Sequence, residues 1–211
     1  AVIPADQRTA FYAKAAGDIV TEDHFESIGP TIGSELVRKS IWAILLVVVA
    51  IALYITWAFR KVAGTVPSWH YGVITLITLF HDVIITLGSF AFLSHFTDAE
   101  VNAPFIAAIL TILGFSVHDT IVVFDRIREN ITRLAEKDFS KIVDSSVRQT
   151  LTRSFNTSFT VLITLLAIFF FGGSSLHYFV VVLIVGIAIG TYSSIFLASP
   201  LLASTAGKKA R

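Results

Sequence analysis

The sequence predicts an all-α membrane protein, a polytopic bundle of transmembrane helices. Two observations predict this class. Of the 211 residues, 55% are hydrophobic, and the mean hydropathy is +0.77, whereas soluble domains are about 45–50% apolar. The apolar residues also gather in runs long enough to cross a hydrocarbon core about 30 Å thick, which takes about 20 helical residues.

Five such runs are present, and we expect one membrane-spanning helix from each: 40–59, 72–93, 104–124, 155–171 and 177–202. Helices are expected because backbone N–H and C=O groups find no water to bond inside lipid. The fourth run is the shortest, and we expect its start, RSFNTSFT, to continue the helix into the interface. The bundle as a whole is expected over 38–205.

Lys and Arg are distributed unevenly among the connecting segments, which predicts the orientation. They are concentrated in three segments, 60–71, 125–154 and the tail 206–211, whereas 94–103 and 172–176 have none. We therefore expect the C-terminus on the cytoplasmic side. Arg38 and Lys39, at the outer end of the first span, go against the rule but are outnumbered.

Residues 1–37 are mixed and polar, so we expect them to be the end of a soluble domain. Five spans and a cytoplasmic C-terminus put residue 1 on the outer side, and 1–37 contains no signal peptide or apolar run. We therefore expect at least one further span upstream. The intact unit would have six spans, with the soluble domain between the first two.

The segment 125–154 has basic residues interleaved with apolar ones at helical spacing: Ile127, Ile131, Leu134, Ile142, Val143, Val147 and Leu151. This pattern is typical of helices that lie on a lipid surface. We expect one or two amphipathic helices on the inner leaflet, with Ser140 as a cap between them. A plain connector is the alternative.

The composition argues against several classes of function. The chain has no cysteine, which excludes disulfides and thiol chemistry. The net charge of +1 gives no indication of a nucleic-acid partner. No phosphate-binding loop or nucleophile elbow is present. We expect no enzyme activity and no cofactor, with an ion gradient or another chain as the energy source.

Charged residues inside the spans are the candidate functional residues, because a charge in lipid is costly. Asp82 is expected about 15 Å from the cytoplasmic end of the second span. Asp119 is expected in the cytoplasmic half of the third, and Asp125 at the interface, where it would be solvated. Arg153 begins the fourth span and can reach inward along its stem.

Asp119 and Arg153 are expected in the same half of the membrane, where their chemistry indicates proton handling. Burial raises the pKa of a carboxyl group, whereas a nearby guanidinium lowers it. Such a pair can therefore hold a proton in one conformation and release it in another. Alternatives are a structural ion pair for Asp119, a lipid-phosphate anchor for Arg153 and a hydrogen-bonded helix brace for Asp82.

His81 and His118 directly precede the two carboxylates and are candidates for a proton relay. Adjacent helical positions point about 100° apart, so we expect each histidine to face away from its carboxylate. We expect no metal site, because neither His–Asp pair has the chelating i,i+4 spacing.

The last span carries a small-xxx-small pattern formed by Gly186, Gly190 and Ser194. Such spacing lets two helices approach closely. We expect tight packing here, with a sliding surface as the alternative.

Several segments resemble the SecF branch of the SecD/SecF family, membrane proteins of bacterial protein export within the resistance-nodulation-division superfamily. In chain order they are ESIGPTIGSELVRKS, HDVIITLG, GFSVHDTIVVFDRIREN, TLTRSFNTSFT, FGG and GIAIGTYSSIFLASPLL. The resemblance covers nearly the whole chain, and VHDTIVVFDRIREN is its most specific part.

The resemblance implies a multi-pass protein of the bacterial inner membrane that works with SecD beside the SecYEG channel and the ATPase SecA. It implies that the proton-motive force is used to pull or hold the exported preprotein on the outer side. Residues 1–37 would end a periplasmic α+β domain. The proton-transport residues would be Asp119, Arg153 and Asp82. A separate SecF and the C-terminal part of a fused SecD–SecF chain are both open.

Two other functions fit the buried charges. A passive scaffold of the translocon would use them as ion pairs for assembly. A small-molecule proton antiporter of the same superfamily would need a substrate pocket.

Overall fold

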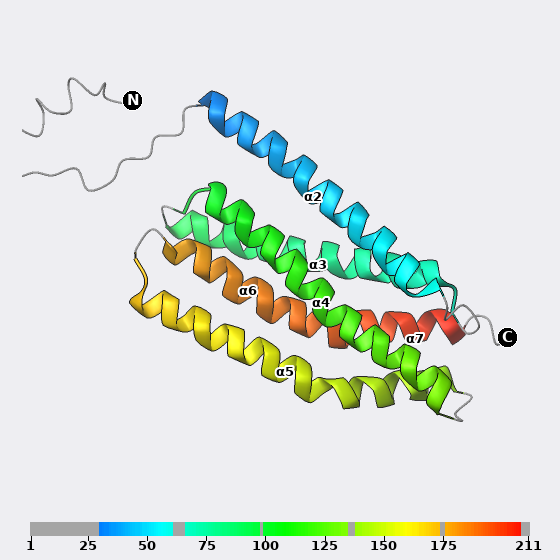
Figure 1. Cartoon of the computed structure of the whole chain (residues 1–211). Helices are drawn as coiled ribbons and strands as arrows, with labels where there is room; N and C mark the ends of the chain where they lie inside the picture. The colour runs from blue at the N-terminus through cyan, green and yellow to red at the C-terminus, as the bar shows by residue number, and fades with distance from the viewer. Residues whose placement is uncertain (1–29, 61–65, 98, 135–137, 174–175, 208–211) are drawn as a thin grey trace, which may run out of the picture. The chain divides into compact units, whose positions relative to one another are not determined.

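The computed structural model describes residues 30–60, 66–97, 99–134, 138–173 and 176–207, and these residues contain helices and no strand. The helices are α2 (Pro30–Ala58), α3 (Ser68–Phe96), α4 (Ala103–Arg133), α5 (Phe139–Phe171), α6 (His177–Ser193), the π-helical turn η3 (Ser194–Ala198) and α7 (Ser199–Gly207) (Figure 1).

Among these residues, five helical stretches are long and apolar enough to span a membrane: Val37–Ala58, Ser68–Phe96, Ala103–Arg133, Phe139–Phe171 and His177–Thr205. The predicted class, an all-α bundle with five spans, is confirmed. The last span combines α6, η3 and α7 into one continuous helix.

The chain divides into two compact units, Ala1–Ile41 and Trp42–Arg211. In the first unit the described residues form the start of α2, where Lys39 and Glu35 form an ion pair of 2.9 Å. The predicted α+β domain end over 1–37 lies outside the described residues except for 30–37, which are helical. Most of the predicted basic tail, 206–211, also lies outside them.

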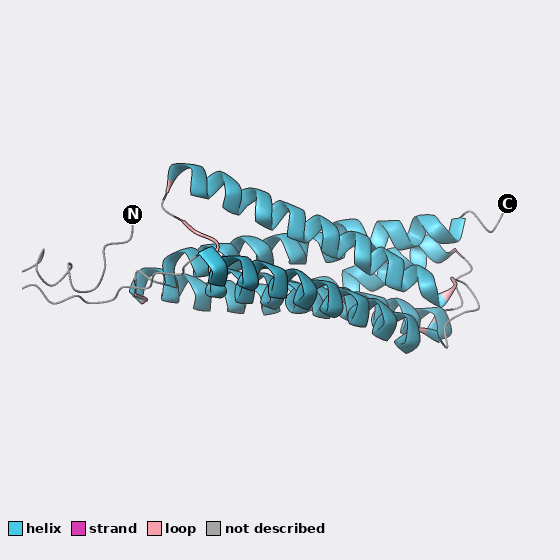
Figure 2. Ribbon diagram, turned by 90° about the horizontal axis from the view of Figure 1, so that it is seen from above, coloured by secondary structure: helices cyan, strands magenta, loops and turns pink. Residues whose placement is uncertain are grey.

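In the second unit α4 and α6 form the centre of the bundle. They contact each other, and each also contacts α3 and α5. Figures 1 and 2 show these four helices lying side by side along a common direction. Of the 18 most apolar consecutive residues in the third span and in the last span, 50% are buried, against 17% in α5. Polar side chains on the inward faces of α4 and α6, such as Ser116 and Ser193, are therefore surrounded by protein.

An aromatic cluster joins residues 42–60, α3 and α4 at one end of the bundle. Phe59 stacks on Tyr71 with ring centroids 4.9 Å apart, and Phe124 meets both rings edge-on at 6.1 and 5.3 Å. All three side chains are at most 3% exposed. Edge-to-face and offset aromatic pairs add to the stability that burial gives, so this cluster fixes the relative depth of the three segments.

The two ends of the long α4–α5 hairpin follow from local sequence. Asn102 caps α4 by accepting a hydrogen bond from the Phe105 amide at 3.0 Å, with a proline in the first turn. Asp138 caps α5 and accepts from the Ser140 amide at 3.0 Å. The cap is thus Asp138, and the predicted cap Ser140 is the donor.

The segment 125–154 differs from its prediction as separate helices on the inner leaflet. It forms the last turns of α4 and the first turns of α5, with only 134–138 between them. Its apolar residues Ile127, Ile142 and Val143 are at most 4% exposed. The same 3.6-residue spacing serves a helix on lipid and a helix that buries one face against a neighbour, so spacing alone does not separate them.

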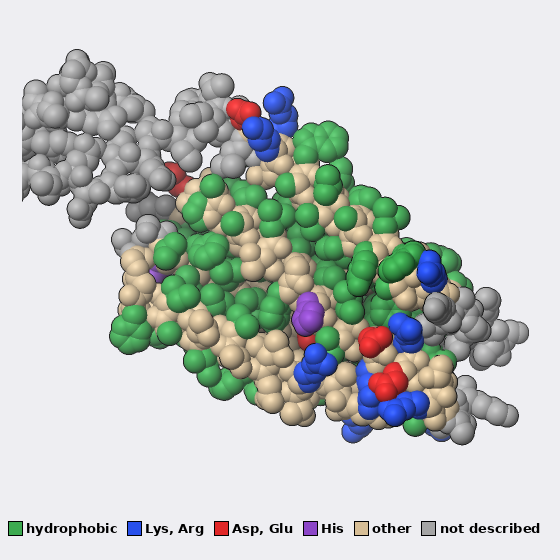
Figure 3. All heavy atoms as spheres, viewed as in Figure 1, with side chains coloured by type: hydrophobic (Ala, Val, Ile, Leu, Met, Phe, Trp, Pro, Cys, Tyr) green, Lys and Arg blue, Asp and Glu red, His purple; other side chains and the backbone are tan. Residues whose placement is uncertain are grey.

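Charged side chains gather over this end of α4 and α5, while hydrophobic side chains cover much of the remaining surface seen in Figure 3. Arg133 and Arg148 form ion pairs along their own helices with Glu129 (2.6 Å) and Asp144 (3.0 Å). A broad apolar surface bounded by charges is what a lipid bilayer requires of the protein it surrounds.

Candidate functional site

The first carboxylate of the site, Asp82, lies on α3 and is 1% exposed. Its Oδ2 accepts two hydrogen bonds, from the Ser116 hydroxyl of α4 at 2.5 Å and from the Ser193 hydroxyl of α6 at 2.8 Å. Its Oδ1 lies 3.0 Å from Nδ1 of His81. Asp82 therefore joins three helices through its carboxylate.

The expectation that His81 faces away from its carboxylate was wrong. The imidazole is flexible about its two side-chain torsions, and its ring nitrogen reaches the neighbouring carboxylate although the two Cα–Cβ bonds diverge. The His81 side chain is 30% exposed, so it connects the buried Asp82 to the exposed surface of α3. His118 is exposed and makes no hydrogen bond with a described residue, as expected for it.

The second carboxylate, Asp119, lies on α4 and is 6% exposed. Its Oδ1 accepts from the Ser154 hydroxyl of α5 at 2.5 Å, and its Oδ2 accepts from the Ser194 hydroxyl of η3 at 2.5 Å. Asp119 thus points into the bundle and joins α4 to both neighbours on that side.

The two carboxylates form one site because their partners are adjacent. Ser116 and Asp119 are one helical turn apart on α4, and Ser193 and Ser194 are consecutive in the last span. Every partner except His81 is a neutral hydroxyl. A hydroxyl both donates and accepts, so it can bond a carboxylate in either protonation state.

Arg153 does not join this site in the structure. Its side chain is exposed and forms no salt bridge with any residue that the structure describes. The next residue, Ser154, occupies the position at Asp119 instead. Asp125 lies outside as predicted: it is exposed, and its Oδ1 lies 3.6 Å from Nη1 of Arg128.

Close packing of α6 on α4 brings the serines to the carboxylates. A Cβ added at Gly186 would lie 2.2 Å from Cδ1 of Ile112, and one added at Gly190 would lie 3.0 Å from Cβ of Ser116. The predicted tight packing at Gly186 and Gly190 is therefore found, and α4 is the helix that meets this surface.

Ser116 and Ser193 were not among the residues that the sequence singled out. Ser116 has a local signal, because it precedes Asp119 by three positions and so lies on the same helix face. Ser193 has none, since it meets Asp82 across 111 positions of sequence. Among the described residues, no group of three or more His, Asp or Glu side chains is arranged to hold a metal ion.

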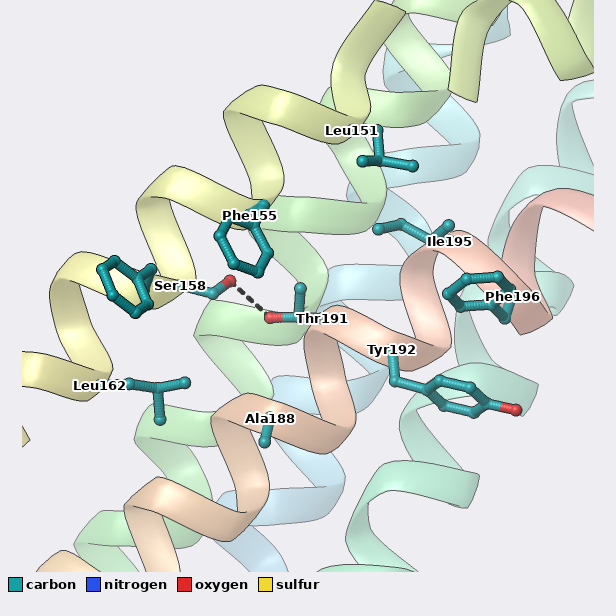
Figure 4. Close-up of a pocket in the computed structure, with 10 residues that line it drawn as sticks. Leu151, Phe155, Ser158, Leu162, Ala188, Thr191, Tyr192, Ile195 and Phe196 are labelled. Carbon is teal, nitrogen blue, oxygen red and sulfur yellow. Dashed lines mark hydrogen bonds between the residues drawn. The ribbon is translucent and has the colours of Figure 1, made fainter. Parts of the chain in front are cut away.

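An apolar groove lies beside the site, between α5 and the last span (Figure 4). Its lining is mostly aliphatic and aromatic, with a hydrogen-bonded pair at its floor, Ser158 and Thr191, whose oxygens are 2.5 Å apart. Neither Asp82 nor Asp119 lines this groove.

Comparison with known proteins finds one family over most of the chain. The family described as "Protein export membrane protein SecD/SecF, C-terminal" matches residues 9–208. The protein translocase subunit SecF of Thermobaculum terrenum is 50% identical over 184 residues, which is 87% of this chain and 57% of that protein. SecF of Haemophilus influenzae is 43% identical over 173 residues, 82% of this chain and 50% of that protein.

A solved structure, the crystal structure of SecDF in its super-membrane-facing form, is similar over 99% of this chain and 27% of that chain. The TM-score is 0.77 and the sequence identity is 33%. This chain spans about half the length of the curated relatives it matches. The match over residues 9–208 and the shared fold show that the chain belongs to the SecD/SecF family of protein export membrane proteins.

Proposed function

We propose that this chain is the membrane part of an accessory subunit of the Sec protein translocase, which uses the proton-motive force to promote late translocation of exported proteins. The observation that carries the proposal is the pair of buried carboxylates, Asp82 and Asp119, each held by hydroxyls from neighbouring helices. A carboxylate inside a membrane destabilises the protein, so its presence there indicates a function, and proton transfer is the function we propose.

Proton uptake at Asp119 changes how three helices fit. The ionised carboxylate accepts hydrogen bonds from α5 and η3 at once. After protonation one oxygen carries an O–H group and must donate, so the serine facing it must accept instead. In this proposal the reversal of donor and acceptor alters the packing of α5 against the last span, which is the requirement for coupling to a gradient.

Arg153 is the proposed basic partner in the alternate arrangement. It directly precedes Ser154 on α5, so a rotation of α5 together with the reach of the long side chain brings its guanidinium toward Asp119. A charged partner would favour the ionised carboxylate and so release the proton.

The proposed setting is the bacterial inner membrane, with the C-terminus in the cytoplasm. The proposed partners are SecD, as a second subunit or as the other half of one chain, the SecYEG channel, SecA and the exported preprotein. Membrane lipids surround the spans. The chain acts in this proposal as a transport subunit and not as an enzyme, with the proton as coupling ion and no cofactor.

The experiment is late translocation into vesicles that contain the complete translocase, with a gradient imposed after ATP is removed. Asp119→Asn should insert normally and lose the gradient-dependent step, because the amide takes up no proton. Asp125→Asn, an exposed carboxylate on the same helix, is the matched control and should keep it. Full gradient-dependent translocation by Asp119→Asn ends the proposal.

If the chain were a passive scaffold, collapsing the proton gradient would leave its contribution to export unchanged. A small-molecule antiporter would need a substrate pocket beside the carboxylates, and the apolar groove between α5 and the last span includes neither of them.

A further inference from the structure

Two consecutive serines in the last span reach two different carboxylates. Ser193 and Ser194 lie at the junction of α6 and η3, and both are fully buried. Ser193 donates to Asp82 on α3, whereas Ser194 donates to Asp119 on α4. The last span therefore contacts both acidic groups through a single turn of backbone.

Each of these hydroxyls has a second acceptor within its own helix. Ser193 Oγ is 2.8 Å from Asp82 Oδ2 and 3.1 Å from the Gly190 carbonyl. Ser194 Oγ is 2.5 Å from Asp119 Oδ2 and 3.0 Å from the Thr191 carbonyl. Since a hydroxyl has one proton, it favours one acceptor at a time.

This arrangement gives each serine two states that match the two states of its carboxylate. When the carboxylate is ionised, the hydroxyl donates to it. When the carboxylate takes up a proton, its new O–H donates to the serine oxygen, and the serine proton turns to its own helix carbonyl. One proton enters, and no hydrogen bond is lost.

The remaining groups that face the carboxylates come from helices other than the last span, and each of them reaches only one carboxylate. Asp82 is also contacted by Ser116 and by the titratable group of His81, and Asp119 by Ser154. No Lys or Arg side chain forms a salt bridge with either carboxylate within the described part of the chain.

The backbone at this point is a π-helical turn. The Ser199 hydroxyl donates across it to the Ser194 carbonyl at 3.0 Å. Single π-turns inside α-helices occur often at functional sites, and their hydrogen-bond register differs from that of the flanking α-helix. Ser193 ends α6 and Ser194 begins this turn, so the two serines are joined where the hydrogen-bond register changes.

We propose that Ser193 and Ser194 are positioning residues that couple Asp82 to Asp119 through this turn, given that the site exchanges protons as in the proposed function. Proton uptake at Asp119 turns the Ser194 hydroxyl toward Thr191, the π-turn adjusts, and Ser193 changes its hydrogen bond to Asp82.

Infrared difference spectroscopy of the complete protein in lipid nanodiscs tests this coupling. The carboxyl band of Asp82 is identified by its absence in Asp82→Asn. Asp119→Asn stands for the protonated site, because its amide donates a hydrogen bond as a protonated carboxyl does. We expect Asp119→Asn to shift the Asp82 band, and this shift to disappear when either Ser193→Ala or Ser194→Ala is added.

Ser158→Ala is the matched control. Ser158 is a buried serine that contacts Thr191 of the same span, yet it touches neither carboxylate. The shift should survive in this variant and should return in Ser194→Thr, which keeps the hydroxyl. Helix content and thermal unfolding are measured for every variant, so a misfolded one is recognised, and the other serine still decides.

Two results would overturn the coupling. If the Asp82 shift persists without the serine hydroxyls, the carboxylates communicate through space. If no shift occurs with both serines intact, they do not communicate. Because the spectra need neither gradient nor substrate, these results are independent of whether Asp119→Asn loses translocation.

Discussion

At the scale of single residues, the hydrogen bonds of Asp82 show how its two proposed roles can be separated. Ser116 and Ser193 both donate to Oδ2, and the other oxygen meets only a histidine nitrogen. An asparagine fits the same geometry, with its carbonyl oxygen facing the serines and its NH₂ facing His81.

We therefore predict that Asp82→Asn folds with nearly the stability of the wild type, whereas Asp82→Ala loses about 1–3 kcal/mol, because it leaves the buried Ser116 hydroxyl without its acceptor and removes the hydrogen bond between Ser193 and α3. Unfolding by detergent titration measures both. If Asp82 only braces the helices, Asp82→Asn keeps gradient-driven translocation, and if it exchanges protons the variant loses it. Equal stability of the alanine and asparagine variants would contradict the hydrogen-bond assignment.

A buried amide holds the tips of α4 and α5 together. Asn130 is 3% exposed, and its Nδ2 lies 2.8 Å from the Ser146 hydroxyl and 3.0 Å from Oε1 of Gln149. Asn130→Ala should lower the free energy of unfolding by about 1–3 kcal/mol. Thr132→Ala should change it by about 0.5 kcal/mol or less, since Thr132 is exposed and bonds only within α4. A loss of unfolding free energy in Asn130→Ala no larger than that in Thr132→Ala would show that Asn130 contributes little.

The buried acids of the site were predictable from the sequence, whereas their partners were not. A carboxylate in an apolar run is visible because its cost in lipid needs an explanation, so Asp82 and Asp119 stood out. Ser193 and Ser194 carry no such cost, and a serine in a membrane helix is ordinary. Arg153 was expected only in the same half of the membrane as Asp119, with a lipid-phosphate anchor as the alternative, and in the structure the neighbouring Ser154 contacts Asp119.

At the scale of helices, α6 can approach α4 closely because glycines face it. Gly186 lies so near Ile112 that an added Cβ would overlap the isoleucine side chain, whereas nothing lies within 4 Å of a Cβ added at Gly114. Ile112 is itself 1% exposed and has little room to move.

We predict that Gly186→Ala lowers the free energy of unfolding by about 1–3 kcal/mol through overpacking. Gly114→Ala on the partner helix should raise it by roughly 0.5–1 kcal/mol, because alanine is the better helix former and meets no clash. Detergent-titrated unfolding compares them. If the two substitutions had the same effect, close contact at Gly186 would not be limiting.

The helices themselves were largely predictable, because each apolar run is long and lipid enforces intrahelical hydrogen bonding. The segment 125–154 was not, since its apolar stripe meets the requirement of a lipid surface and of a helix partner equally. Only the contact of Ile127 and Val143 with the common apolar core decides between them. The π-turn was not predicted, although Pro200 just after it is a local signal, because proline has no N–H to donate to the carbonyl four residues earlier.

For the molecule as a whole, the orientation in the membrane can be tested with single cysteines, because the 211 residues of this chain contain none. Single cysteines at Glu100, between α3 and α4, and at Ser140, at the start of α5, would both be exposed. We predict that a membrane-impermeant maleimide applied outside intact spheroplasts labels Glu100→Cys and leaves Ser140→Cys unlabelled until the membrane is opened. The reverse pattern would contradict the proposed cytoplasmic C-terminus.

If Asp119 binds and releases protons while a preprotein is exported, protons must cross the membrane during export, and their flux can be measured. Vesicles with the complete translocase and an internal pH-sensitive dye would be given an imposed gradient and a preprotein held midway in the channel. We expect preprotein-dependent proton movement in the wild type and in Asp125→Asn and none in Asp119→Asn. Proton movement in Asp119→Asn equal to that of the wild type would contradict this role of Asp119.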